Sequence, residues 1–206
     1  MTIRLSCLAG AAFAACLGVA PLFAQTTEPA PTEPTADPAA EATQPPGPYA
    51  AATFGNWEII CTPMGEGVPE SCEMYQLLLD EQASPLAEIS IAALPLGAEF
   101  AAGATVTTPL ETFLPTGLGF RIGEAETMRI EPFRVCTVVG CIVRMGLSVE
   151  EIDAMKAGAD ATLTIAPFVA VDQPVNITIS LEGFTAAYED VQTRLSLAAA
   201  ATRAGQ

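Results

Sequence analysis

The chain has 206 residues, of which 50% are hydrophobic, and its 24 acidic residues outnumber its 8 basic residues to give a net charge of −16. Nucleic acids and anionic lipid surfaces bind basic stripes, so the excess of acidic residues makes both poor partners. The sequence contains no histidine, which excludes Ser-His-Asp and Cys-His catalysis, imidazole metal ligation and a histidine pH switch.

Residues 1–24 predict a secretory signal peptide. Arg4 precedes an apolar run that is interrupted at Pro21, and Ala24 marks the predicted cleavage site. The apolar run is too short for a comfortable membrane span, so the mature chain is expected to have no transmembrane helix. Lipid attachment at Cys16 remains an alternative. The expected location is the periplasm, the outer membrane or the exterior of a bacterial cell.

Residues 25–53 are rich in Pro, Ala, Thr and Glu and have almost no branched apolar side chains. Such a segment cannot bury enough apolar surface to offset its ordering entropy, which predicts a disordered linker. We expect one folded domain at residues 54–195, followed by a flexible tail at residues 196–206.

Alternation of apolar and polar residues predicts strands through most of this domain. In the first, Trp57, Ile59 and Cys61 share one face. In the second, Met74, Gln76 and Leu78 share one face. Strands are predicted at residues 57–61, 72–79, 86–94, 105–108, 118–122 and 127–132, the last with Met128 and Ile130 opposite Arg129 and Glu131.

Residues 133–147, FRVCTVVGCIVRMGL, predict two short strands joined by a tight turn. The turn is too short for a crossover connection, so the strands should be antiparallel neighbours. Gly140 permits the positive φ that such turns often need. A bridge between Cys136 and Cys141 would pin this hairpin.

A short helix is predicted at residues 148–157, because Ser148 and Glu151 form a capping-box pattern and Gly158 ends the segment. Its acidic residues Glu150, Glu151 and Asp153 suit a helix N-terminus, which favours negative charge, better than an acid–base pair. Strands at residues 161–170 and 174–182 follow. The final element is a helix at residues 185–197 with one apolar side.

Four cysteines remain once the leader is removed, and an even number in an exported chain indicates disulfides. Four cysteines allow three pairings, and the short separations favour Cys61–Cys72 and Cys136–Cys141. A four-thiolate zinc site is the alternative, but it needs CxxC-like spacing that this sequence lacks. Neither pair has the CxxC, helix-start setting of a catalytic dithiol, so the bridges are expected to be structural.

These elements together predict a mainly β domain of two layers with two local disulfides and a late helix. The segments FGNWEIIC, Cys72 to Gln76, CTVVGC and ISLEGFTAAYED resemble the invasion-associated locus B family of alphaproteobacterial envelope proteins. The resemblance covers nearly all of residues 54–190. It implies a disulfide-linked β-sandwich of immunoglobulin-like architecture, exported to the periplasm or outer membrane. It brings no catalytic residues with it.

The sequence therefore predicts an exported, non-enzymatic interaction protein whose partner is another envelope or host-surface protein. No catalytic residue, cofactor site or metal site is expected. One alternative is a periplasmic small-molecule binder or a carboxylate-based enzyme that uses Glu124 and Glu126 near Gly123. Another is a structural component of the envelope. The oligomeric state is not determined by the sequence.

Overall fold

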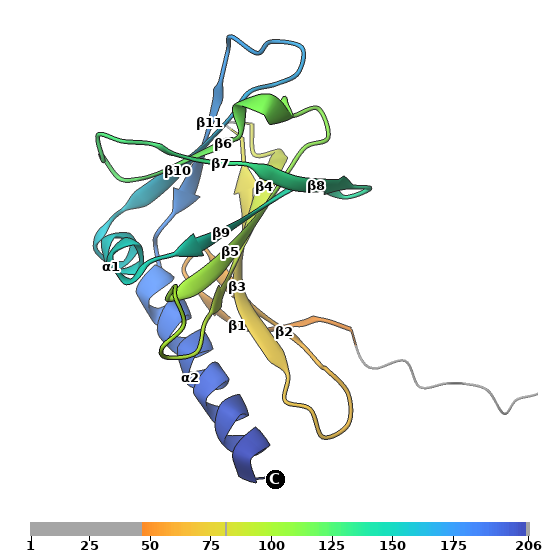
Figure 1. The fold of residues 1–206 in the computed structure, drawn as a ribbon, viewed down its shortest axis with the longest axis vertical. Coiled ribbons are helices and arrows are strands. Elements are labelled where there is room, and N and C mark those ends of the chain that lie inside the picture. The colour runs from red at the N-terminus through yellow and green to blue at the C-terminus, as the bar shows by residue number, and fades with distance from the viewer. Residues whose placement is uncertain (1–46, 81, 205–206) are drawn as a thin grey trace, which may run out of the picture. The chain divides into compact units, whose positions relative to one another are not determined.

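The computed structural model describes residues 47–80 and 82–204. The predicted signal peptide, Cys16 and most of the predicted linker lie outside these residues. The described chain forms two antiparallel sheets, two α-helices and one turn of 3-10 helix, η1 (Leu114–Thr116) (Figure 1). The predicted mainly β fold with two sheets is confirmed, and its arrangement is compatible with an immunoglobulin-like sandwich.

The larger sheet has seven strands, and its first five follow one another as a meander. The hairpin predicted at residues 133–147 adds the last two strands, so the order is β1-β2-β3-β4-β5-β9-β8. The strands are β1 (Tyr49–Phe54), β2 (Trp57–Thr62), β3 (Ser71–Leu79), β4 (Pro85–Ala93), β5 (Ala102–Thr108), β8 (Phe133–Thr137) and β9 (Gly140–Leu147).

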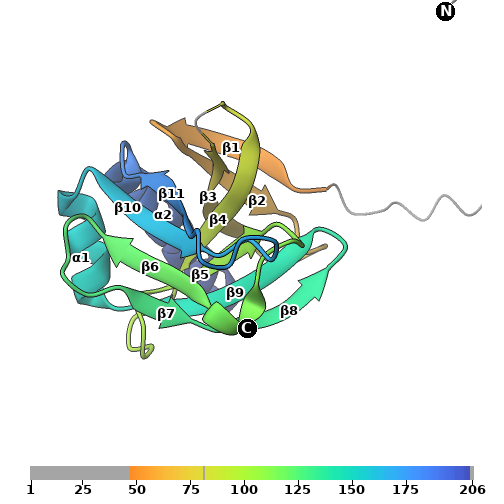
Figure 2. The same cartoon turned by 90° about the horizontal axis from the view of Figure 1, so that it is seen from above.

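The smaller sheet has four strands in the order β11-β10-β6-β7. They are β6 (Leu118–Ile122), β7 (Arg129–Glu131), β10 (Asp160–Ile165) and β11 (Val175–Ser180). Helix α1 (Val149–Ala157) begins after β9 and contacts β6, beside which it lies in the view from above (Figure 2). The structure confirms both halves of its predicted capping box, Ser148 and Glu151.

One apolar core lies between the two sheets and helix α2 (Phe184–Ala204). The side chains predicted to share one face of β2 and of β3 are buried, and Ile89 and Ile91 of β4 are buried in the same way, as alternation requires. Helix α2 packs on the same three strands. Its Phe184 ring meets the buried Trp57 ring edge-on at 5.5 Å and lies 6.0 Å from the Tyr188 ring. These aromatic contacts fix the helix against the larger sheet.

Two predicted boundaries are wrong. Strand β1 occupies Tyr49–Phe54, most of which was assigned to the linker. An edge strand is held by backbone hydrogen bonds to its neighbour, so it needs no apolar alternation. The segment 196–204, predicted to be a flexible tail, continues helix α2, because its run of alanines has the highest helix propensity.

One strand prediction also needs correction. Strand β10 ends at Ile165, and residues 166–174 form a loop rather than the end of a strand, because Pro167 cannot donate a ladder hydrogen bond. In β7, Ile130 lies opposite Arg129 and Glu131, as predicted, and it is the charged pair that is partly buried whereas Ile130 is exposed. Arg129 on this face contacts Glu131, Glu151 and the Phe120 ring.

Both edge strands of the larger sheet are irregular. Strand β1 shifts register against β2 between Ala50 and Ala52. Strand β8 shifts register against β9 between Phe133 and Val135. Among the described residues, neither helix is long and apolar enough to cross a membrane.

Candidate interaction surface

The β8–β9 hairpin carries the first disulfide at its end. Cys136 and Cys141 lie opposite each other in register and are bonded to each other, as predicted. Gly140 adopts φ +147°, and a Cβ at this position would lie 2.5 Å from the carbonyl oxygen of Thr108. Glycine is therefore required where the turn passes against β5. The disulfide and this close packing both hold the turn in place.

Two valines form the tip of this hairpin. The side chain of Val138 is 97% exposed, and that of Val139 is also largely in solvent. Turn positions usually hold Gly, Asn, Asp or Ser, because these residues favour turn geometry and bind water. Val139 also lines a hollow of about 420 Å³ together with Leu77 and Pro109. The tip thus presents apolar side chains next to a shallow apolar hollow.

Two loops extend the apolar surface away from the hairpin. The Thr108 hydroxyl donates to the carbonyl of Cys141 at 3.3 Å and accepts from the Thr112 hydroxyl at 3.1 Å. The backbone N–H of Phe168 donates to the carbonyl of Glu111 at 2.7 Å. The hairpin, the segment 108–114 and the loop 166–174 are therefore connected by successive hydrogen bonds.

We name the exposed apolar residues of these three segments the apolar end. It comprises Val135, Val138, Val139, Leu110, Leu114, Phe168, Val169 and Val171. Val169 is 88% exposed. Single exposed apolar residues are ordinary on protein surfaces, but several gathered on adjoining turns mark a contact site. In Figure 1 the loop before β11 and η1 lie at the top of the molecule, and the β8–β9 tip lies to the right.

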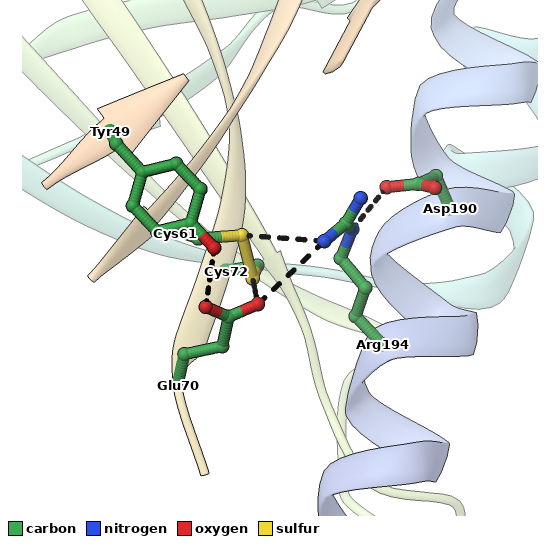
Figure 3. Close-up of a disulfide and its surroundings, with 6 residues drawn as sticks. All are labelled: Tyr49, Cys61, Glu70, Cys72, Asp190 and Arg194. Carbon is green, nitrogen blue, oxygen red and sulfur yellow. Dashed lines mark hydrogen bonds and ion pairs between the residues drawn. A yellow bond between two sulfur atoms is a disulfide. The ribbon is translucent and has the colours of Figure 1, made fainter. Parts of the chain in front are cut away.

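The second disulfide lies elsewhere, between β2 and β3. Cys61 and Cys72 are bonded as predicted (Figure 3). Arg194 of α2 donates to Sγ of Cys61 at 3.7 Å and lies 3.7 Å from the carboxylate of Glu70. The pKa of the Arg194 guanidinium is raised chiefly by its hydrogen bond to Asp190. Through these contacts Arg194 holds helix α2 against strands β2 and β3, which the disulfide joins.

The Tyr49 hydroxyl extends the same cluster by donating to the other carboxylate oxygen of Glu70 at 2.6 Å. That hydrogen bond raises the pKa of Tyr49. Glu70 lies beside the two bridged cysteines, but both sulfurs are bonded to each other. All four cysteines of the described residues are in disulfides, so none of these four offers a thiolate to zinc, and they do not form the alternative four-thiolate site.

The remaining candidates from the sequence do not converge on one site. Glu124 and Glu126 are both exposed on the turn between β6 and β7. At the start of α1, Glu151 completes the capping box, and the pKa of Glu150 is lowered mainly by backbone hydrogen bonding and also by the Ser148 hydroxyl. These acidic residues serve the helix terminus, as expected.

Sequence reasoning missed the apolar end. Its residues come from three segments between positions 110 and 171 that adjoin only after folding. One signal was available, since Val138 and Val139 are apolar, β-branched residues at turn positions between two cysteines.

Comparison with known proteins finds one matching family and a similar solved structure. The model of the family described as "Invasion associated locus B (IalB) protein" matches residues 57–192. The crystal structure of invasion associated protein B from Bartonella henselae is similar with a TM-score of 0.60 and 20% sequence identity, over 70% of this chain and 97% of that chain. At this identity the similarity supports the fold alone. No curated protein matches the chain.

Proposed function

Since the chain belongs to the invasion-associated locus B family, we propose that it is an exported, non-enzymatic protein that binds another envelope or host-surface protein through the apolar end. The observation that carries this proposal is the exposure of Val138 and Val139 on a turn that is braced by a disulfide and by Gly140. An exposed apolar tip held in one conformation loses little entropy on binding.

The composition of the surface supports a protein partner. A few residues near the centre of a protein interface supply most of the binding energy, and aromatic side chains are enriched there. Phe168 is the aromatic residue of the apolar end, and its ring lies 6.4 Å from that of Phe113. Charged residues lie at the margin of the apolar end: Glu111, Arg134 and Asp172 are its neighbours in the sequence, and Glu88 lines the hollow beside Val139. Such a surface is suited to burying apolar area.

Photocrosslinking in intact cells tests the proposal. A photoreactive residue replaces Val138, and irradiation should yield an adduct of one discrete size that mass spectrometry identifies as a protein. Adding Phe168→Ser to the same variant should reduce the adduct severalfold. A photoreactive residue at Val68, a valine that is 54% exposed on the β2–β3 loop, is the control and should give no such adduct. Adducts with lipid alone, or equal adducts at both positions, would contradict the proposal.

A further inference from the structure

A second surface feature lies at the C-terminal half of α2. There the loop 94–101, which connects β4 to β5, forms a groove of about 540 Å³ with the helix. Leu94, Leu96, Leu195 and Ala199 supply its apolar walls. In Figure 1 this end of α2 lies at the bottom of the molecule, away from the loop before β11. The volume is within the range of about 300–1,000 Å³ typical of small-molecule sites.

The loop that forms one wall is held in place by backbone contacts. The N–H of Leu94 donates to the carbonyl of Ala101 at 3.0 Å, and the N–H of Ala101 donates to the carbonyl of Leu147 at 2.9 Å. The buried Tyr188 hydroxyl also donates to the carbonyl of Ala101, at 3.1 Å. The loop is thus fixed at its base, although Leu96 at its tip is fully exposed. The groove is formed before any ligand binds.

The charge of the groove is unusual for this protein. Arg203 is the charged residue in its lining, which contains no carboxylate, whereas the whole chain has three times as many acidic as basic residues. Nε of Arg203 donates to the carbonyl of Ala199 at 3.1 Å. Within the described residues its guanidinium forms no ion pair. The positively charged guanidinium of Arg203 therefore lies at one end of an apolar groove, where it can pair with an anionic group.

We propose that this groove binds an anionic amphiphile with a single alkyl chain. The chain packs against Leu94, Leu96 and Leu195, and the anionic head group pairs with Arg203. Guanidinium binds carboxylate and phosphate alike, with two parallel hydrogen bonds. The ligand is therefore defined by an alkyl chain and one of these two head groups. This proposal concerns a surface other than the apolar end and does not depend on a protein partner.

Calorimetric titration of the full mature chain tests the site with probes below their micelle concentration. Decanoate, dodecanoate, dodecyl phosphate and neutral dodecanol are titrated separately. Dodecanoate should bind about tenfold more tightly than decanoate, since each buried methylene contributes up to about fourfold. Dodecanol should bind more weakly than dodecanoate. The ratio of dodecanoate to dodecyl phosphate affinity distinguishes a carboxylate from a phosphate head group.

Two variants locate the site. Ala199→Trp fills the groove and should reduce dodecanoate affinity at least tenfold. Ala201→Trp is the matched control, because residue 201 is exposed on the opposite side of α2, and it should bind as the parent does. Arg203→Gln should weaken dodecanoate about three- to tenfold and leave dodecanol unchanged.

Three results would overturn the proposal. One is that no probe binds. Another is that dodecanoate binds equally well to the Ala199→Trp variant, which would place binding elsewhere. The third is that dodecanol binds as tightly as dodecanoate with no effect of Arg203→Gln, which would show that the site does not select an anion. Loss of the crosslink at Val138 would not affect any of these outcomes.

Discussion

The side-chain amide of Gln76 forms two hydrogen bonds with the backbone of Ser180, 104 residues further along the chain. Its Nε2 donates to the Ser180 carbonyl at 2.9 Å, and its Oε1 accepts from the Ser180 N–H at 2.9 Å. Gln76 lies on β3 of the larger sheet and Ser180 ends β11, an edge strand of the smaller one. The side-chain amide thus pairs with Ser180 as the backbone of a neighbouring strand would, and this pairing links the two sheets.

Replacing Gln76 with leucine should destabilise the protein by about 2 kcal/mol. Leucine fits the buried position but leaves the Ser180 N–H without a partner, and an unsatisfied buried donor costs about 1–3 kcal/mol. The Ser180 carbonyl keeps its hydrogen bond from Trp57. Urea unfolding with the disulfides intact measures the change. Gln82→Leu on an exposed turn is the control and should change stability by less than about 0.5 kcal/mol.

Gly183→Ala should be more damaging than Gly97→Ala. Both glycines have positive φ, +84° and +88°, so alanine is similarly strained at each. A Cβ at position 183 would lie 2.0 Å from the carbonyl oxygen of Phe54, whereas position 97 has open space. We expect alanine to destabilise the protein by about 1 kcal/mol at position 97 and by several kcal/mol at position 183. Equal melting temperatures for the two variants would show that the contact between Gly183 and Phe54 is not tight.

Removing either disulfide by paired Cys→Ala replacement should cost about 2–3 kcal/mol in unfolding free energy. Both bridges should resist glutathione, as structural bridges do. A stronger dithiol should open Cys136–Cys141 first, because Cys136 is exposed, whereas Cys61 is buried and Cys72 only partly accessible. Alkylation and peptide mapping after timed reduction give the order. Labelling of Cys72 before Cys136 would contradict the prediction.

Arg129→Lys should destabilise the protein by about 1–3 kcal/mol despite keeping the charge. The guanidinium pairs with Glu151 at 2.7 Å, donates to the Gly146 carbonyl at 3.3 Å and lies 5.4 Å above the Phe120 ring. Its Nε also lies 3.1 Å from Glu131, without a hydrogen bond. A lysine ammonium cannot make these contacts together.

Arg134→Lys is the matched control for this replacement, because Arg134 is exposed on β8. It should leave the unfolding free energy nearly unchanged. A loss at position 129 no larger than that at position 134 would show that the ion-pair cluster does not stabilise β7.

Stability should fall between about pH 10 and pH 12. Burial and a 3.0 Å hydrogen bond to Glu88 raise the pKa of Tyr75 to about 12 from its usual 10.0. The fold therefore favours protonated Tyr75, so this contribution is complete below pH 10 and disappears as the pH rises through 12. Burial also raises the pKa of Tyr188. Ionisation of Tyr188 therefore lowers the stability further as the pH rises.

Titration of the tyrosines by NMR, alongside unfolding at each pH, measures this effect. Glu88→Gln should lower the pKa of Tyr75 without returning it to 10, because burial is the largest cause of the shift. Glu66→Gln, on an exposed loop, should leave it unchanged. A Tyr75 that ionises near pH 10 in the parent protein would refute the assignment.

The sequence predicted those parts of the fold that depend on local pattern. Alternation identified the inner faces of β2 and β3, and the pair Ser148 and Glu151 identified the start of α1. Short separation favoured both disulfide pairings. Each of these features is encoded within about a dozen residues.

What the sequence did not predict depends on contacts between distant segments. In β7, alternation separated Ile130 from Arg129 but did not show that the charged face would be the partly buried one. The partner that Arg129 meets on this face is Glu151, 22 residues away. Likewise Gln76 was assigned to an inner face, but its partner Ser180 could not be identified. The apolar end and the groove at Arg203 depend on the packing of loops and on the true length of α2.

The register shifts in β1 and β8 bear on self-association of the protein through the edges of the larger sheet. A regular, exposed edge strand is a template for strand addition from another molecule, which leads to fibres and aggregates. In the larger sheet both terminal strands carry such an irregularity, at Ala50–Ala52 and at Phe133–Val135. A bulge bends the strand and interrupts its row of backbone donors and acceptors. Addition of a further strand to the larger sheet is thereby hindered at both ends.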